Sequence, residues 1–137
     1  GEGEDKKDLN ELINKFNLED HISLIGFKKD VYRYMQNAKG LILTSISENP
    51  GHVLIEAAAN NCPIISSNCP TGPSEFLENG KGGVLFETNN EDDFFENFKK
   101  FMSQSLSEKY EKKIFAKRKS KSYTCFRHYL QLKNIIN

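Results

Sequence analysis

Two short apolar runs constrain the fold of this chain more than any other feature of its sequence. Residues 40–45 read GLILTS and residues 63–68 read PIISSN, and neither run alternates apolar with polar side chains. Continuous apolar runs of this length, bounded by turn residues, are typical of strands that are buried on both faces of a sheet. Pro63 is acceptable because it stands at the start of its run. The sequence therefore predicts a sheet that helices cover on both sides.

Helical patterns alternate with these runs along the whole chain. Strands that alternate with helices at this spacing form a parallel sheet wound by right-handed crossovers. We therefore expect an α/β fold, a Rossmann-like parallel sheet flanked by helices. The further strands are expected over 21–27 and 82–87, and the helices over 7–17, 30–37, 52–61, 72–80, 91–104, 106–119 and 122–136.

The helix expected over 91–104 carries a stripe of large apolar side chains. Such a stripe indicates a face packed on the core rather than a cofactor site. Ligands of parallel α/β sheets bind instead outside the carboxyl ends of the strands. The stripe consists of Phe94, Phe95, Phe98, Phe101 and Met102, and the loops expected to carry function are Gly26–Asp30, Ser45–Gly51, Ser67–Gly72 and Glu87–Asn90.

The formal net charge of zero conceals an uneven distribution. Residues 105–137 carry nine Lys or Arg and two Glu, a net charge of +7, so residues 1–104 carry −7. A shift of this size marks a different kind of surface. We therefore divide the chain into a first domain over 1–104, whose ligand is argued below, and basic C-terminal helices over 105–137.

Composition excludes several classes of protein. With 19 basic and 19 acidic residues, the chain lacks the basic excess that a nucleic-acid partner requires. No run of 18 apolar residues occurs, so no membrane-spanning helix is expected. The three cysteines, Cys62, Cys69 and Cys125, are odd in number and form no CxxC pair. They argue against a disulfide framework or a zinc site and fit the reducing cytoplasm.

The stretch from 44 to 67 carries the pattern most typical of a binding site. A buried strand is expected to end at Ser45, and after a polar loop a helix begins near His52. The free backbone N–H groups of His52, Val53 and Leu54 then face the carboxyl edge of the sheet. Gly51 lets an anion approach the backbone closely, so this helix start is a candidate phosphate site.

Two carboxylates flank this helix start. Glu56 lies one turn inside the helix, and helical side chains lean toward the N-terminus, so it can reach the same ligand. A carboxylate repels a diphosphate but accepts hydrogen bonds from hydroxyls, such as those of a ribose. Glu48 can do the same for a second sugar. On the residues alone, the alternative is a helix-terminal charge at Glu48 and a solvated helix face at Glu56.

These residues carry a resemblance to a known family. Glu48 and Glu56 are separated by seven residues, in SENPGHVLIEAAANNCPIISSNCPTGPSEFLENGKGGVLF. This stretch resembles the C-terminal, donor-binding domain of family 4 retaining glycosyltransferases with the two-domain GT-B fold, nearest to those that extend bacterial surface glycans. The residues that match the family pattern are Ser45, Glu48, Gly51, Glu56, Ala57, Pro63, Ile64, Gly72, Pro73 and Glu75.

The resemblance implies a role for each matching position. Glu56 is expected to bind the ribose of a nucleoside diphosphate sugar, and Glu48 is expected to face the donor sugar as the catalytic carboxylate. Asn49 and Pro50 stand where the family has Gly and Phe, which puts the identity of the sugar in doubt. Backbone groups of Asn49, Pro50, Gly51, His52, Val53 and Leu54 are expected to hold the sugar and the diphosphate, and Gly26, Phe27 and Lys28 to lie against the nucleobase.

The resemblance also describes the whole enzyme. The chain has no initiator Met and opens on GEGEDKKDLN, a turn without its strand, so we expect the C-terminal piece of a longer protein. That protein would transfer a hexose, from UDP-hexose or UDP-N-acetylhexosamine, to a glycan or lipid-linked acceptor in the cytoplasm, without a metal or cofactor. The N-terminal domain and its basic pair are missing here, so this piece alone is expected to be inactive. The alternatives are a GT-B nucleotide-sugar epimerase and a non-catalytic binding module.

Other candidate residues have structural interpretations beside the functional ones. Asp92 and Asp93 are expected to favour a helix N-terminus rather than bind metal. Cys62 and Cys69 are expected to be buried small hydrophobes. Glu75 is left open between the donor site and a helix cap. The basic tail is expected to pack on the N-terminal domain, with peripheral contact to anionic lipid at the inner face of the membrane as the alternative.

Overall fold

The structure is a computed structural model that describes residues 3–49 and 51–136. It consists of two compact units, Gly1–Val31 and Tyr32–Asn137. Each unit is described by itself below. The division at residue 104 between a binding domain and basic helices stays a prediction.

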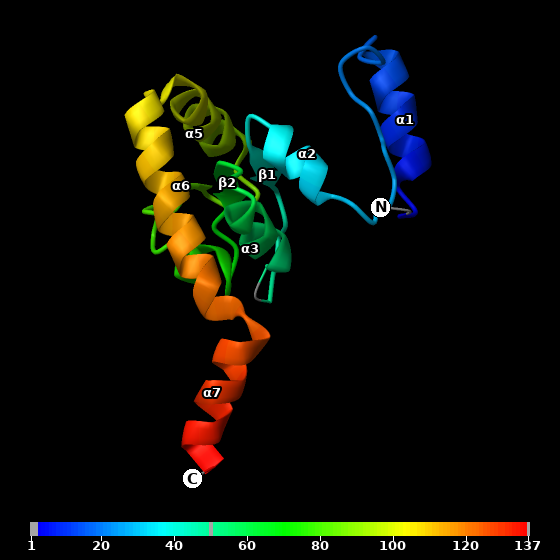
Figure 1. The fold of residues 1–137 in the computed structure, drawn as a ribbon. Helices are drawn as coiled ribbons and strands as arrows, with labels where there is room; N and C mark the ends of the chain where they lie inside the picture. Colours follow the sequence, from blue (N-terminus) through cyan, green and yellow to red (C-terminus); the bar gives the residue numbers. More distant parts are fainter. Residues whose placement is uncertain (1–2, 50, 137) are drawn as a thin grey trace. The chain divides into compact units, whose positions relative to one another are not determined.

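The sheet of the second unit is parallel, as predicted. Its strands are β1 (Leu41–Leu43), β2 (Ile64–Ser67) and β3 (Val84–Phe86), in the order β1-β2-β3 (Figure 1). Ile42 pairs with Ile65, and Ile65 pairs with Val84. All four residues of the central strand are buried, which confirms the interpretation of its apolar run. The same interpretation is wrong for β1, which stands at the edge of the sheet and leaves Ile42 exposed.

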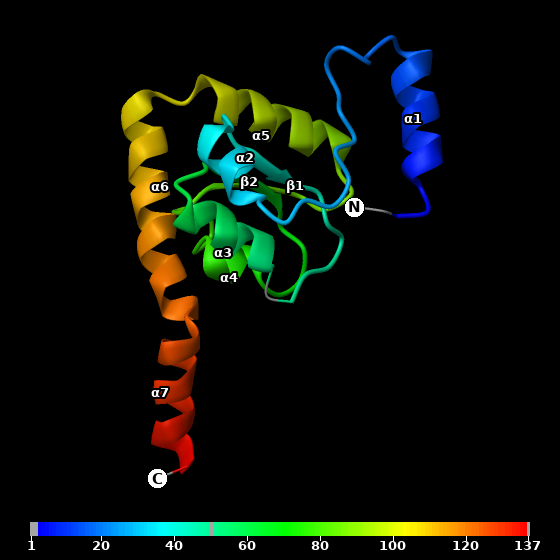
Figure 2. The same cartoon turned by 45° about the vertical axis from the view of Figure 1, so that its right-hand side comes forward.

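Helices cover both faces of this sheet. Helix α5 packs on β2 and β3, whereas α3 packs on β1 and β2 and also contacts α4 and α6. Figure 2 shows α5 on one side of the strands and α3 and α4 on the other. The helices are α1 (Lys6–Lys15), α2 (Tyr32–Asn37), α3 (His52–Ala59), α4 (Pro73–Phe76), α5 (Glu91–Ser103), α6 (Leu106–Ser120) and α7 (Cys125–Ile136), with the 3₁₀ turn η1 (Lys121–Tyr123) between the last two.

The phenylalanine stripe forms much of the core on the α5 side. Phe101 is buried with Ile65 and Phe86, and Phe94 and Phe98 pack against this cluster. The stripe is narrower than predicted, because Phe95 and Met102 are exposed. They stand at the edges of the apolar arc, where the short strands do not reach.

Helix α6 is a well-formed part of the second unit. Its start is a capping box: Ser105 accepts a hydrogen bond from the Glu108 backbone N–H, and the Glu108 carboxylate accepts one from the Ser105 N–H. Hydrogen bonds from the Ser105 hydroxyl and from the Ser105 N–H to the Glu108 carboxylate hold the pKa of Glu108 below its ordinary value. Ala116 and Ser120 are buried where α6 packs along α3.

Helix α7 departs from the prediction. Tyr123 in η1 packs edge-on against Phe76, with ring centroids 5.4 Å apart. The helix predicted over 122–136 begins only at Cys125, and Phe126, Tyr129 and Leu132 on it are exposed. No described helix combines the length and the apolar character needed to cross a membrane.

The first unit holds α1 but lacks the strand predicted over 21–27. Residues 22–28 form neither helix nor strand, so that prediction is wrong. A strand exists only where its backbone pairs with a neighbour, and no described segment pairs with this one. Ile22, Ile25 and Phe27 are exposed accordingly.

The helix predicted over 72–80 is also shorter than expected. Helix α4 ends at Phe76, and Glu78, Asn79 and Gly80 follow with positive φ angles of 45°, 52° and 99°. Left-handed residues cannot continue a right-handed helix. The remainder of the predicted helix is therefore a turn that leads into β3.

Candidate functional site

The carboxyl end of β1 leads through a short loop into α3, and Gly51 forms the junction. Gly51 has φ 79° and ψ 60°, which is the left-handed region, and is the residue that precedes the first turn of α3. A Cβ there would lie 3.3 Å from Cδ1 of Leu54, a fully buried side chain. Glycine is thus required for both the backbone angle and the packing at this helix start.

The first turn of α3 offers fewer free donors than the sequence predicted. The N–H of Leu54 donates to the carbonyl of Gly51 at 2.9 Å, so it is already used. The N–H groups of His52 and Val53 have no hydrogen-bond partner among the described residues, and His52 is exposed. Among the residues that the structure describes, this helix start therefore has two backbone donors without a partner, beside an exposed imidazole.

The two carboxylates of the pattern lie on either side of this helix start. Glu48 is half-buried in the loop, and its Oε1 accepts a hydrogen bond from the Ser45 hydroxyl at 2.7 Å. Glu56 is half-buried one turn into α3. No described residue donates a side-chain hydrogen bond to the Glu56 carboxylate. Both groups retain oxygens that can accept from a ligand.

Two hydroxyls whose role the sequence did not indicate tie this loop to the end of β2 and to the loop that follows it. The Ser67 hydroxyl donates to the Ser45 carbonyl at 2.6 Å, and the Thr71 hydroxyl lies 2.6 Å from the Glu48 carbonyl oxygen. Their partners are more than 20 residues away, so no local pattern could have revealed them. The only signal was the presence of hydroxyl residues in two loops that follow adjacent strands.

A shallow hollow of about 450 Å³ lies farther along the same edge, at the carboxyl ends of β2 and β3. Asn68, Glu87, Asp93 and Asn97 contribute its polar lining. Asp93 Oδ2 accepts from the Glu87 N–H at 2.6 Å, and the Asp93 N–H donates to Asn90. Asn90 is thus the N-cap of α5, and Asp92 and Asp93 stand in its first turn, where acidic side chains favour the helix dipole.

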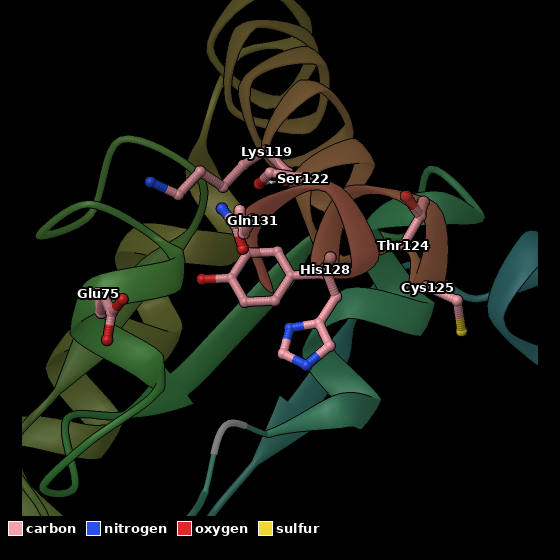
Figure 3. Close-up of a pocket in the computed structure, with 8 residues that line it drawn as sticks. Glu75, Lys119, Ser122, Thr124, Cys125, His128 and Gln131 are labelled. Carbon is pink, nitrogen blue, oxygen red and sulfur yellow. Dashed lines mark hydrogen bonds between the residues drawn. The ribbon is translucent and has the colours of Figure 1, made fainter. Parts of the chain in front are cut away.

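Glu75 lines a different hollow, of about 510 Å³, beside the junction of α6 and α7 (Figure 3). The exposed Glu75 carboxylate lies on α4, across the hollow from His128 and Gln131 of α7. No cap hydrogen bond from a side chain is present at the start of α4. The structure therefore gives no support to the helix cap, and a role of Glu75 in the donor site stays a prediction.

The cysteines are free, as predicted, and Cys62 and Cys69 are buried. Burial raises the pKa of the Cys62 thiol above its ordinary value. Among residues 3–49 and 51–136, no group of three His, Cys, Asp or Glu is arranged to hold a metal ion.

The residues expected at the nucleobase belong to the first unit. Gly26 has a φ of 63°, and Phe27 is 74% exposed, so its ring is free to stack on a flat ligand. Their role stays a prediction, as do the roles of the other site residues. Pro50 lies outside the described residues.

A family model described as glycosyl transferases group 1 matches residues 1–120. The chain belongs to this family. The expected resemblance to a C-terminal GT-B glycosyltransferase domain is confirmed by this match and by the relatives and structures below.

Two relatives with curated names show what the family includes. One is the N-acetylgalactosamine-N,N'-diacetylbacillosaminyl-diphospho-undecaprenol 4-alpha-N-acetylgalactosaminyltransferase of Campylobacter jejuni, 32% identical over 124 residues, or 90% of this chain and 33% of the relative. The other is the poly(ribitol-phosphate) alpha-N-acetylglucosaminyltransferase of Staphylococcus aureus, 32% identical over 68% of this chain and 19% of the relative. The chain thus spans a third or less of these two relatives.

Solved structures share the fold. A mutant of S. aureus TarM, in complex with fondaparinux, alpha-GlcNAc-glycerol and UDP, superposes with a TM-score of 0.86 at 25% identity, covering 100% of this chain and 28% of that one. The α/β architecture predicted from the strand pattern is therefore that of the GT-B glycosyltransferases.

Proposed function

We propose that this chain is the donor-binding domain of a retaining glycosyltransferase that uses a UDP-hexose or UDP-N-acetylhexosamine. The observation that carries the proposal is the junction of β1 and α3. There, a left-handed Gly51 opens a helix whose His52 and Val53 N–H groups have no partner among the described residues, with Glu56 one turn inside. Named relatives that transfer N-acetylhexosamines and a neighbour that binds UDP support the choice of donor.

The diphosphate is the ligand that this helix start suits. The N–H groups of His52 and Val53 lie at the positive end of the α3 dipole, and Gly51 adds no side chain between them and an anion. No described Lys or Arg side chain hydrogen-bonds to the loop before α3. The remaining phosphate charge would therefore need cations from elsewhere in the enzyme.

The two carboxylates suit the hydroxyl-bearing parts of the donor. Glu56 would accept hydrogen bonds from the ribose. Glu48, whose Oε1 is held by Ser45, would face the sugar with its second oxygen and stabilise the positive charge that develops there during transfer. Gly26, Phe27 and Lys28 would contact the base, with the exposed Phe27 ring as the stacking surface.

The acceptor and the surroundings of the enzyme are also proposals. The acceptor would be a glycan or a lipid-linked glycan bound largely by the rest of the protein. The exposed apolar side chains of α7 and the basic charge of 105–137 would contact that second domain. Peripheral contact with anionic lipid is the alternative. We place the reaction in the cytoplasm, without a metal or cofactor, and expect this chain alone to transfer no sugar.

Calorimetry and NMR with UDP, UDP-GlcNAc and UDP-GalNAc test the proposal. We expect UDP to bind and to shift the amide signals of His52 and Val53, whereas inorganic phosphate at the same concentration shifts them far less. Binding of UDP that moves only signals distant from α3 would contradict the proposed site. The absence of any binding at millimolar UDP would contradict the proposed function.

A further inference from the structure

Thr71 is held in a backbone conformation that threonine avoids. Its φ is 58°, in the left-handed region, on the loop between β2 and α4. For a β-branched residue a positive φ is a true outlier, since Cβ crowds the following carbonyl. Such a conformation persists only where its surroundings hold it, and it is found mostly at functional positions.

The contact that accompanies this conformation is made to the loop of Glu48. The Thr71 hydroxyl lies 2.6 Å from the Glu48 carbonyl oxygen and 2.7 Å from that of Pro70. One hydroxyl proton serves both, so the hydrogen bond is shared. Of the two carbonyls, only that of Glu48 belongs to another loop, 23 residues earlier in the chain.

A second hydroxyl secures the other end of the same loop. Ser67 is buried and donates to the carbonyl of Ser45 at 2.6 Å, and the hydroxyl of Ser45 donates to Oε1 of Glu48 at 2.7 Å. The backbone on both sides of the Glu48 side chain and one of its carboxylate oxygens are thereby fixed. Among the described residues, Oε2 has no hydrogen-bond partner.

We propose that Thr71 and Ser67 are positioning residues that hold Glu48 toward the donor sugar. Their hydroxyls clamp the loop before α3 to the loop after β2, so that Oε2 faces a fixed direction. The ligand part of this inference rests on the proposed function, since it assumes that Glu48 meets a sugar. The clamp itself stands on the contacts alone.

Two variants of Thr71 separate the clamp from a purely structural role. Thr71→Gly removes the hydroxyl but relieves the unfavourable φ, so we expect the melting temperature to stay the same or to rise. Thr71→Ser keeps the hydroxyl and serves as the rescue. Asn17→Gly is the matched control, because Asn17 also has a positive φ, of 53°, but lies in the first unit.

The first measurement needs no ligand. In Thr71→Gly we expect the NMR order parameters of the Ile46–Asn49 amides to fall from about 0.85, typical of rigid backbone, toward about 0.6. Thr71→Ser and Asn17→Gly should leave them unchanged. Unchanged order parameters in Thr71→Gly would overturn the clamp.

The second measurement compares two ligands by calorimetry. We expect Thr71→Gly to weaken binding of UDP-GlcNAc about fivefold, the ratio that one ordinary hydrogen bond supports, while binding of UDP changes less than twofold. An equal loss for both ligands would overturn the role toward the sugar. If the unmodified chain binds neither ligand, the proposed function fails, and the order parameters still decide whether the clamp exists.

Discussion

Two loops at opposite edges of the same sheet use similar backbone conformations and are held in different ways. The loop before α3, residues 44–51, ends at the left-handed Gly51 and lies at the carboxyl edge. The loop before β3, residues 77–83, passes through Glu78, Asn79 and Gly80 with positive φ and lies at the amino edge. We call them the site loop and the lysine-held loop.

Charged side chains secure the lysine-held loop. Lys112 donates to the carbonyls of Gly80 and Gly83, the latter at 3.1 Å. Lys119 forms an ion pair with Glu78 at 2.8 Å. Both lysines come from α6, so this loop and helix stabilise each other.

Neutral hydroxyls secure the site loop, through Ser67 and Thr71. No ion pair with Glu48 or Glu56 occurs among the described residues. A lysine there would neutralise the carboxylates that the proposed donor needs. The comparison therefore teaches that charged side chains stabilise the fold at one edge, whereas at the other edge neutral hydroxyls do so and the described residues leave both carboxylates without an ion pair. Four predictions follow this contrast, from the largest effect to the smallest.

Gly51→Val is expected to affect the site loop most. The left-handed φ costs an L-residue about 1–2 kcal/mol, and the new Cβ would press on buried Leu54 at 3.3 Å, so we expect about 3 kcal/mol of lost stability in total. Affinity for UDP per folded molecule should fall more than about tenfold, because the side chain covers the helix start.

Gly3→Val is the control for this change, since nothing lies within 4 Å of the position of its Cβ. Urea unfolding and calorimetry give the two quantities. Loss of stability with unchanged UDP affinity would show that Gly51 serves only the turn, and that the first turn of α3 is no anion site.

Lys112→Met is expected to affect the lysine-held loop alone. It leaves the carbonyls of Gly80 and Gly83 without their donor, so we expect a loss of about 2 kcal/mol in unfolding free energy. Lys121→Met, at an exposed position, is the control. Affinity for UDP should stay the same. A loss of UDP affinity together with the loss of stability would show that the two loops do not have separate roles.

Glu56→Gln is expected to act on binding without acting on the fold. An amide presents an N–H₂ group where the ribose hydroxyls need an acceptor, so we expect a loss of about 1.5 kcal/mol, roughly tenfold in UDP affinity. Glu91→Gln on α5 is the matched control for charge. Calorimetry that shows equal affinity for both variants would remove Glu56 from the site.

The ion pair of the lysine-held loop is expected to produce a small effect of pH. The hydrogen bond from Lys119 holds the pKa of Glu78 below its ordinary value of 4.5 and raises the pKa of Lys119 above 10.5. The Glu78 contribution to stability is therefore present above pH 4.5 and lost as pH falls through the lowered pKa. The Lys119 contribution is present below pH 10.5 and lost as pH rises through the raised pKa.

Melting curves from pH 7 to pH 3 check the acidic limb. The difference in melting temperature between the unmodified chain and Glu78→Gln should shrink as pH falls below 4.5, and it should be small at pH 7 because the pair is partly exposed. A difference that stays constant down to pH 3 would show that the ion pair does not contribute.

Local sequence patterns located the strands at 40–45 and 63–68 but also predicted a strand over 21–27 that does not form. Both apolar runs form strands, but only PIISSN is buried on both faces as predicted, whereas Ile42 of the edge strand β1 is 44% exposed. The run over 21–27 has a similar composition but finds no partner strand among the described residues. A strand forms only when it pairs with a second segment, so the composition of residues 21–27 alone could not predict whether they form one.

The sequence by itself determined the parallel α/β class, most of the helices and the family, because apolar periodicity and the spacing of Glu48 and Glu56 are local to the chain. Only the tertiary structure decided that the Leu54 N–H is already used, that Lys112 and Lys119 hold one edge, and that Ser67 and Thr71 clamp the other. Each of these facts depends on the direction of a hydrogen bond between atoms, and most of them join residues far apart in the chain. These hydrogen bonds form only when the helices and strands pack together, and a local sequence pattern does not indicate which atoms will then meet.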